Sequence, residues 1–265
     1  MLAFDTKISL CAVISQLVLH SRIGALMPFL LLMTLIFFNM NEAFSDSNQY
    51  FSNSVSIGKV IINGQDIESS NDIIEGAGIQ GTIKKTLEEF SIVDVNGVFE
   101  VIYRHGPPSL SISGDDNIIK HVLSEVSNNT LKLSIDKSYK SAHPIVIKVF
   151  SAKIQRMKIE GAGTVSLNNI STDQLTLNVL GSVDIIAKGK TTRFNLNLQG
   201  SGDVRARYLD ADIVNIFLTS TSDIEVTAHT KLQVNITGVG DVLYFGSPKE
   251  IIKQISGLGD IEAGE

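Results

Sequence analysis

The chain has one cysteine, Cys11, and no tryptophan among its 265 residues. A single cysteine excludes a disulfide scaffold, and it also excludes a zinc or iron–sulfur site built from several cysteines. Positive charge is scarce too, with 22 lysines and arginines against 28 aspartates and glutamates and a formal net charge of −6. This balance argues against a nucleic-acid-binding protein, which would need basic residues to neutralise phosphates.

Recognisable catalytic motifs are also missing. The sequence contains no nucleophile elbow, Walker loop or dinucleotide-binding fingerprint. Its four histidines beyond residue 45 are scattered and lack the spacing of metal ligands; they are His105, His121, His143 and His229. We therefore expect no enzymatic activity.

A long hydrophobic run lies near the N-terminus. Residues 23–38 carry no charge, Arg22 precedes them, and Ala43-Phe44-Ser45 follows. This is the order of a secretory signal peptide with a small-residue cleavage site, and the run is shorter than the roughly 20 residues that span a membrane. We predict a signal peptide over residues 1–45, with an uncleaved anchor, and hence membrane contact through this leader, as the alternative. Translation from Met1 or from Met27 stays open.

Export follows from either reading of this leader. The remaining chain is expected in the periplasm, at the cell surface or in the medium, and Cys11 lies outside the mature protein. Residues 46–80 are rich in serine, asparagine and aspartate, and we predict that they form a linker or are loosely ordered.

A sixfold repeat occupies residues 155–265. Each copy has a short segment of small residues, and these segments begin at positions 161, 181, 200, 220, 238 and 257, which are 18 to 20 residues apart. We predict turns there, because glycine tolerates positive φ angles and close backbone approach. The predicted turn glycines are Gly161, Gly163, Gly181, Gly200, Gly202, Gly238, Gly240, Gly257 and Gly259. Ser220-Thr221-Ser222 replaces the glycines of the fourth copy.

Apolar residues alternate before each of these turns. Leu177 and Val179 before Gly181 are typical, whereas Lys253 stands at an apolar position of the last copy. A period of two indicates strands with one face inward. A 19-residue unit cannot bury its own apolar face, but stacked copies can. We therefore predict an all-β, single-domain β-solenoid over residues 81–265, with coils of about 19 residues; a sandwich of hairpins is the alternative.

The segment before the repeats alternates without repeating. Asn96-Gly97 lies between two apolar runs, which predicts a hairpin turn. Asp115-Asp116-Asn117 precedes an apolar run that ends at Val126, which predicts one short helix near residues 116–127, capped by a side-chain oxygen.

Several motifs resemble a known bacterial family. They are the segment Glu89 to Val95, Ser113-Gly114-Asp115-Asp116-Asn117, Leu131-Lys132-Leu133, the repeated Gly-x-Gly-Asp turns, and Tyr244 to Pro248 followed by Ser256 to Gly259. Together they are similar to the "putative autotransporter adhesin, head GIN domain" family over about residues 76–265. The resemblance implies an extracytoplasmic β-solenoid and a role as an adhesin.

A column of aspartates is predicted where the coils stack. It comprises Asp184, Asp203, Asp223, Asp241 and Asp260. Stacked carboxylates repel unless hydrogen bonds or a cation compensate. We expect each aspartate to accept backbone N–H bonds in its own turn. Ca²⁺ bridging adjacent coils is the alternative and would be the one cofactor. Aspartates in uniform surroundings do not divide into a catalytic acid and base.

An asparagine ladder is the best candidate contact surface. Asn178, Asn197 and Asn235 occupy equivalent outward positions, and we predict that they stack on one face. We predict a non-enzymatic binding or adhesion protein of the bacterial envelope, whose partner is a glycan or a protein. Two alternatives are a polysaccharide-cleaving enzyme on the same scaffold and a structural envelope element that binds another protein. Homo-oligomerisation through an exposed last coil also stays open.

Overall fold

The structure is a computed structural model that describes residues 51–52, 60–62, 65–67, 73–219 and 221–264. The predicted signal peptide lies outside these residues. The described residues belong to one compact unit, residues 50–265. They are nearly all β, and their one helix is α3 (Asp116–Ile119).

Four short strands come first in the described chain. β2 (Val60–Ile62) pairs with β3 (Gln65–Ile67) as an antiparallel hairpin. β1 (Phe51–Ser52) and β4 (Ile74–Glu75) lie on either side of β10 (Tyr139–Ser141). The described parts of the predicted linker therefore contain short strands.

A twelve-stranded sheet begins with antiparallel strands and continues with parallel ones. β5 (Gln80–Thr86) and β11 (Val146–Ser151) each pair antiparallel with β7 (Ser109–Asp115). β11 then pairs parallel with β6 (Ile92–His105). β6 passes through Gly97 as one strand, so the predicted hairpin at Asn96-Gly97 was wrong. Gly97 has a φ of +144°, which redirects the strand without reversing it, and both halves pair parallel with the next strand.

The predicted helix was too long. α3 ends at Ile119, and Val122–Ser127 forms strand β8, which pairs antiparallel with β9 (Thr130–Ile135). The tight turn between them is Asn128-Asn129, whose φ angles of 49° and 63° suit a hairpin. Pairing across this turn selects strand over helix. Asp115 makes no side-chain capping bond to α3.

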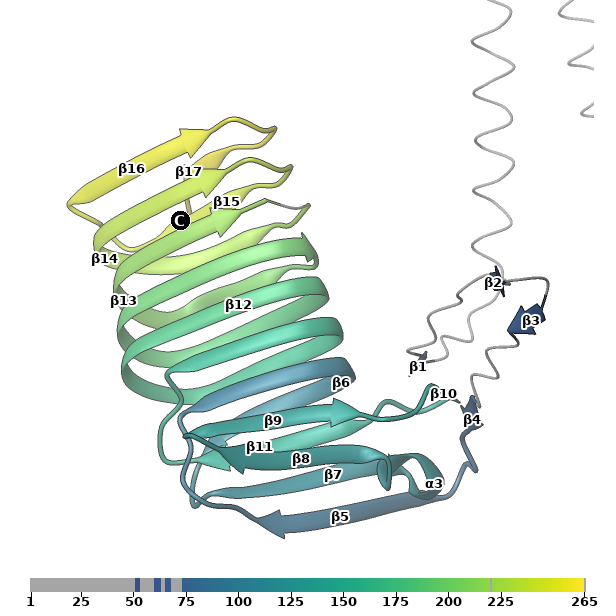
Figure 1. Ribbon diagram of the computed structural model, residues 1–265. Helices are drawn as coiled ribbons and strands as arrows, with labels where there is room; N and C mark the ends of the chain where they lie inside the picture. The colour runs from purple at the N-terminus through teal and green to yellow at the C-terminus, as the bar shows by residue number, and fades with distance from the viewer. Residues whose placement is uncertain (1–50, 53–59, 63–64, 68–72, 220, 265) are drawn as a thin grey trace, which may run out of the picture. The chain divides into compact units, whose positions relative to one another are not determined.

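The remaining strands form a parallel stack (Figure 1). They are β12 (Arg156–Ser201), β13 (Val204–Leu218), β14 (Ile224–Ile236), β15 (Val242–Phe245), β16 (Glu250–Ile255) and β17 (Ile261–Ala263). Paired residues lie about one repeat apart in sequence: Leu196 opposes Ile216, Ile216 opposes Val234, and Val234 opposes Lys253.

The same register builds the core. Leu196, Ile216 and Val234 are fully buried, whereas Ile255 in the last strand pair is 43% exposed. Lys253, which is exposed, donates from Nζ to the carbonyl oxygen of Ile261 at 2.6 Å. Among the described strands, β16 pairs with β14 alone, and a lysine on such an edge strand disfavours pairing with a further strand.

Gly181 shows why glycine recurs between strand segments. Its φ is +131°, and a Cβ there would overlap the carbonyl oxygen of Gly161 on the adjacent segment. Gly200 lies against Gly181 in the same way. Both conformation and space therefore exclude a side chain in this column.

We predict that Gly181→Ala lowers the free energy of unfolding by at least about 2 kcal/mol, because it adds backbone strain and steric overlap. Urea unfolding followed by circular dichroism measures this. Gly106→Ala is the matched control, since its Cβ would contact only the Phe150 side chain at 3.4 Å. Equal losses in the two variants would contradict the prediction.

Two buried tyrosines make stability depend on alkaline pH. The hydroxyls of Tyr103 and Tyr139 donate to the carbonyl oxygens of Ser151 and Val98, at 3.0 and 2.7 Å. Burial raises the pKa of Tyr103 to about 12 and also raises the pKa of Tyr139. The unfolded chain releases these protons at about pH 10. Their contribution to stability is therefore complete below that pH and is lost as the pH rises through the folded pKa.

We predict that tyrosinate absorbance at 295 nm from Tyr103 and Tyr139 appears together with unfolding during an alkaline titration. Tyr103→Phe should make the free energy of unfolding fall less steeply above pH 10. Full ionisation of every tyrosine near pH 10 in a protein that keeps its native circular dichroism would contradict the prediction.

Candidate functional site

One outward face of the stack carries rows of amide side chains. The strand segments that form it are residues 175–180 and 194–199 of β12, together with the C-terminal parts of β13 and β14. Inward residues along these segments are buried, so the alternate residues point outward. We call this surface the amide face; its members are Thr176, Asn178, Asn195, Asn197, Asn215, Phe217 and Asn235.

The amides form two hydrogen-bonded rows. In one row, Asn197 Nδ2 donates to Asn178 Oδ1 at 2.6 Å. In the second row, Asn215 Nδ2 donates to Asn195 Oδ1 at 2.8 Å, and Asn195 Nδ2 donates to Thr176 Oγ1 at 3.3 Å. Each amide is held by its neighbours, so the face presents ordered donors and acceptors.

Phe217 interrupts the first row. It lies in register between Asn197 and Asn235 and is 45% exposed. Asn235 therefore bonds away from the other two predicted ladder residues and donates to Gln254 Oε1 at 3.2 Å. The second row, Thr176–Asn195–Asn215, was not predicted, although its residues recur at the repeat spacing.

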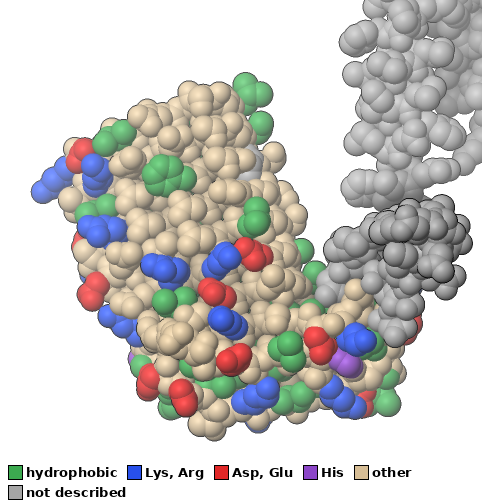
Figure 2. Space-filling view, viewed as in Figure 1, with side chains coloured by type: hydrophobic (Ala, Val, Ile, Leu, Met, Phe, Trp, Pro, Cys, Tyr) green, Lys and Arg blue, Asp and Glu red, His purple; other side chains and the backbone are tan. Residues whose placement is uncertain are grey.

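A shallow groove crosses the amide face where the strands meet the glycine column. Asn178, Asn197, Leu180 and Gln199 line it, and the ion pair between Lys158 and Glu160 closes one side, with Nζ and Oε1 2.6 Å apart. The hydrogen bond that Lys158 donates to Glu160 raises the pKa of Lys158. Uncharged groups cover much of the upper part of the face in Figure 2, and charged side chains of both signs are scattered around them.

The predicted aspartate column uses hydrogen bonds between successive aspartates, which lie 18 to 19 residues apart. The backbone N–H of Asp203 donates to Asp184 Oδ1, that of Asp241 to Asp223 Oδ1, and that of Asp260 to Asp241 Oδ1, at 2.8 to 3.1 Å. The prediction of bonds within each turn was therefore wrong for these carboxylates. In the parallel register, the N–H of the next aspartate lies within hydrogen-bonding distance of each of these carboxylates.

Calcium bridging stays a prediction. No group of three or more histidine, cysteine or acidic side chains in the described part of the chain is arranged to hold a metal ion. The histidines contact separate partners; for example, His121 Nδ1 lies 3.0 Å from Asp136 Oδ1, and His229 bonds to Asp210. That bond is the main reason why the pKa of Asp210 is lowered.

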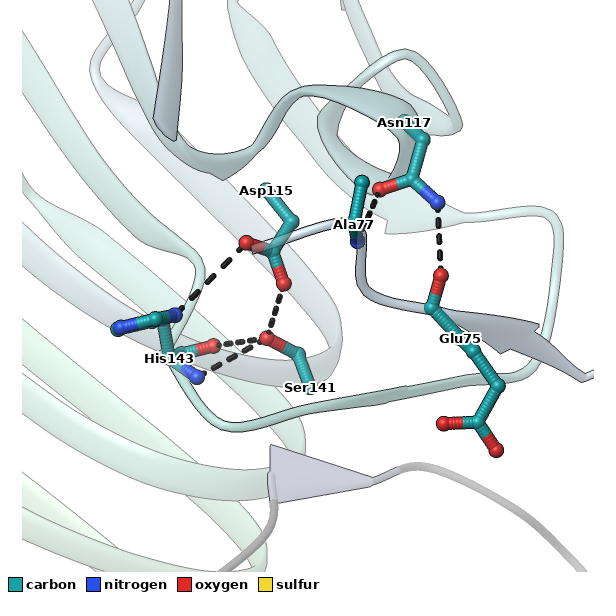
Figure 3. A network of polar contacts seen from close by, with 6 residues as sticks. All are labelled: Glu75, Ala77, Asp115, Asn117, Ser141 and His143. Atoms are coloured by element: carbon teal, nitrogen blue, oxygen red, sulfur yellow. Dashed lines mark hydrogen bonds and ion pairs between the residues drawn. The ribbon is translucent and has the colours of Figure 1, made fainter. Parts of the chain in front are cut away.

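A buried polar cluster surrounds Asp115 (Figure 3). Asp115 is 2% exposed, and Ser141 Oγ donates to its Oδ2 at 2.6 Å. The backbone N–H of His143 donates to Ser141 Oγ at 2.9 Å. Asp115 Oδ1 accepts no hydrogen bond, and His143 Nδ1 lies 3.7 Å from it. The serine is therefore bonded to the aspartate, and no histidine ring is in place to take its proton.

This cluster holds the segment that precedes β5. Asn117 donates from Nδ2 to the carbonyl oxygen of Glu75 at 2.7 Å and accepts from the N–H of Ala77 at 3.0 Å. A side chain at Gly76 would overlap Asp115 Oδ2. We therefore expect the cluster to have a structural role. Sequence reasoning assigned Asp115 to a helix cap and missed the cluster, because its members are brought together only by the fold.

Comparison with known proteins gives one family. A model described as "Putative auto-transporter adhesin, head GIN domain" matches residues 89–248. No curated protein matches the chain. Within the part of the chain that the structure describes, no helix is long and apolar enough to span a membrane.

Two solved structures are similar to this chain. A crystal structure of a "putative adhesin" from Bacteroides fragilis is 26% identical, covers 72% of this chain and 100% of its own, and superposes with a TM-score of 0.60. A "putative adhesin" from Parabacteroides distasonis is 20% identical, with 73% and 100% coverage and a TM-score of 0.48.

We predict that Ser141→Ala lowers the free energy of unfolding by about 1–3 kcal/mol, because it leaves a second oxygen of the buried Asp115 without a donor. Chemical denaturation measures the change. Ser182→Ala removes an exposed hydroxyl that contacts Ser201 Oγ at 2.9 Å, and it should change stability by less than about 0.5 kcal/mol. A loss at Ser141 no larger than this control would show that the cluster is not structural.

Proposed function

Because the chain belongs to the head GIN domain family of "putative auto-transporter adhesins", we propose that it is an exported, non-enzymatic binding protein of the bacterial envelope that holds a glycan on its amide face. Residues 1–45 would direct its export. We further infer that the parallel stack is a β-solenoid with coils of about 19 residues, since paired residues lie 18 to 20 positions apart at Leu196–Ile216, Ile216–Val234 and Val234–Lys253.

The observation that carries this proposal is the exposed Phe217 between ordered amides. An aromatic ring offers an apolar surface for the C–H face of a sugar, and amides can both donate to and accept from hydroxyls. Hydrogen-bonded amides lie on both sides of the ring, with Asn178 and Asn197 on one side and Asn235 on the other. Because the neighbouring hydrogen bonds already hold them, little side-chain freedom would be lost on binding.

The environment of the turn aspartates supports binding rather than cleavage. A glycosidase needs two carboxylates in unlike surroundings, one acting as an acid. Asp184, Asp223 and Asp241 each accept the N–H of the next aspartate in the column. Their surroundings are alike, so nothing about them distinguishes an acid from a base.

A glycan array tests the proposal, with the full chain expressed from its own leader. We expect binding to a defined set of glycans, and Phe217→Ala should weaken it by at least about tenfold, equivalent to ~1.4 kcal/mol. Tyr208→Ala is the matched control, because Tyr208 is also an exposed aromatic, at 70%, but lies outside the amide face. Its binding should be unchanged.

Two results would contradict the glycan proposal. One is an array without signal, which would leave a protein partner, as expected for a structural envelope element. The other is an equal loss of binding in Phe217→Ala and Tyr208→Ala. Release of shortened oligosaccharides from a bound glycan would instead support the enzyme alternative.

A further inference from the structure

A second face of the stack has opposite charges at its two ends. We call it the charged face; it consists of the outward side chains of β5, β7, β11, the C-terminal half of β6, residues 163–168 and 183–188 of β12, and the N-terminal parts of β13, β14, β15 and β17. β5 lies near one end of the stack and β17 near the other (Figure 1). This face is distinct from the amide face, which uses other segments of the same coils.

The first half of the charged face is basic. Register places one outward residue of each strand in a single row that crosses this half. Its members, in order, are Lys84, Ser111, Lys148, Ile102 and Ser166. A groove here is lined by Lys84, Lys148 and also Lys85. Lys84 and Lys148 are exposed and form no ion pair with any residue that the structure describes.

The second half is acidic. Here the register gives a second row of outward residues. Its members, in order, are Ile186, Arg205, Glu225, Leu243 and Glu262. A groove here is lined by Glu225 and Glu262 together with aspartates of the turn column. Among described residues, neither glutamate has an ion-pair partner.

The two halves continue one another through β12. Gly181 lies directly against Gly161, twenty positions earlier, and the same offset places Ile186 next to Ser166. The row therefore crosses ten strand segments, five on each side of this junction. With strands ~4.8 Å apart, it is roughly 43 Å long.

Opposite charges stand at equal distances from the middle of this row. If a second copy is turned by a twofold axis that runs along the strands between Ser166 and Ile186, Lys84 meets Glu262 and Lys148 meets Glu225, and each contact occurs twice. Copies stacked without this reversal would place like charges together. The pattern thus selects one orientation.

Less favourable contacts lie nearer the middle. In the line of outward residues beside this row, Glu100 of one copy would face Asp203 of the other. Arg205 already lies 3.3 Å from the Asp203 carboxylate, and it would stand between the two acids. Apolar Ile102 and Ile186, both half-buried, add contact area near the axis. A face three outward side chains wide and ~43 Å long would bury roughly 700–800 Å² on each copy, which is enough for a stable dimer.

We propose that the charged face is a self-association surface on which two copies of this chain pair as a reversed, twofold-symmetric dimer, with the basic half of each copy on the acidic half of its partner. Since charge pairs at the ends orient the copies, association weakens as salt screens them.

Sedimentation velocity tests the proposal, using the full chain expressed from its own leader. We expect a dimer at 50 mM NaCl whose dissociation constant rises at least about tenfold at 300 mM NaCl. Two variants reverse one half each: Lys84→Glu with Lys148→Glu makes the face acidic throughout, and Glu225→Lys with Glu262→Lys makes it basic throughout. Each variant alone should associate at least about tenfold more weakly than the unaltered chain.

Mixing the two variants gives the decisive result. An acidic face and a basic face should form a one-to-one heterodimer, and a chain with all four substitutions should regain homodimerisation. Arg156→Glu with Arg193→Glu, at exposed sites away from the charged face, is the matched control and should leave the dimer unchanged. Far-UV circular dichroism and melting temperature confirm that each variant folds.

Three results would overturn the proposal. The unaltered chain could remain monomeric at 50 mM NaCl and 100 μM protein, or the folded variants could fail to associate when mixed. The third is a monomer that binds a sulfated polysaccharide through Lys84 and Lys148, which would assign the basic half to an anionic glycan.

Discussion

Parallel hydrogen bonding in register between adjacent strands is the constraint on which the rest of the structure depends. It places residues about one repeat apart directly over one another at the strand spacing. The side chain at each position must therefore pack against similar side chains on the two adjacent strands. Leucine, isoleucine and valine satisfy this condition inside, as Leu196, Ile216 and Val234 do. Glycine satisfies it where one backbone lies against the next, as at Gly181 and Gly161.

Polar columns meet the same constraint in two different ways. Asparagine is self-complementary, because its amide donates a hydrogen bond to the residue on one side and accepts one from the residue on the other side. Asn197, for example, donates directly to Asn178. Aspartate has no proton to donate, so stacked aspartates would repel. Here Asp184, Asp223 and Asp241 each accept the backbone N–H of the next aspartate in the column. The stack therefore accommodates a column of like charges within its own hydrogen bonding.

Much of the fold could be predicted because periodicity and register are properties of the sequence. Membership of the head GIN domain family and the nearly all-β character were both predicted, and both are confirmed. Local signals failed where pairing partners decided the outcome. Val122–Ser127 has an apolar content compatible with a helix, yet pairing with Thr130–Ile135 makes it a strand. Gly97 bends a strand without ending it, since both halves find parallel partners.

The polar sites were harder to predict, because they depend on which segments the fold brings together. Asp115, Ser141 and Asn117 come from three separate elements and meet around Gly76. No spacing along the chain signals that contact. Phe217 could be recognised in the sequence as an exception to an asparagine column, but only the register shows that it separates Asn197 from Asn235.

Outward residues that depart from the repeated pattern carry the most information about function. Inward positions and the glycine column are fixed by stacking, so their residues report the fold and carry little information about a ligand. Outward side chains are free of that requirement, and a departure from the repeat there is not needed for folding. Phe217 within the amide rows is one such departure, and the change from Lys84 and Lys148 to Glu225 and Glu262 along the charged face is another. The parallel stack thus separates residues that the fold requires from residues that it leaves free to vary, by position alone.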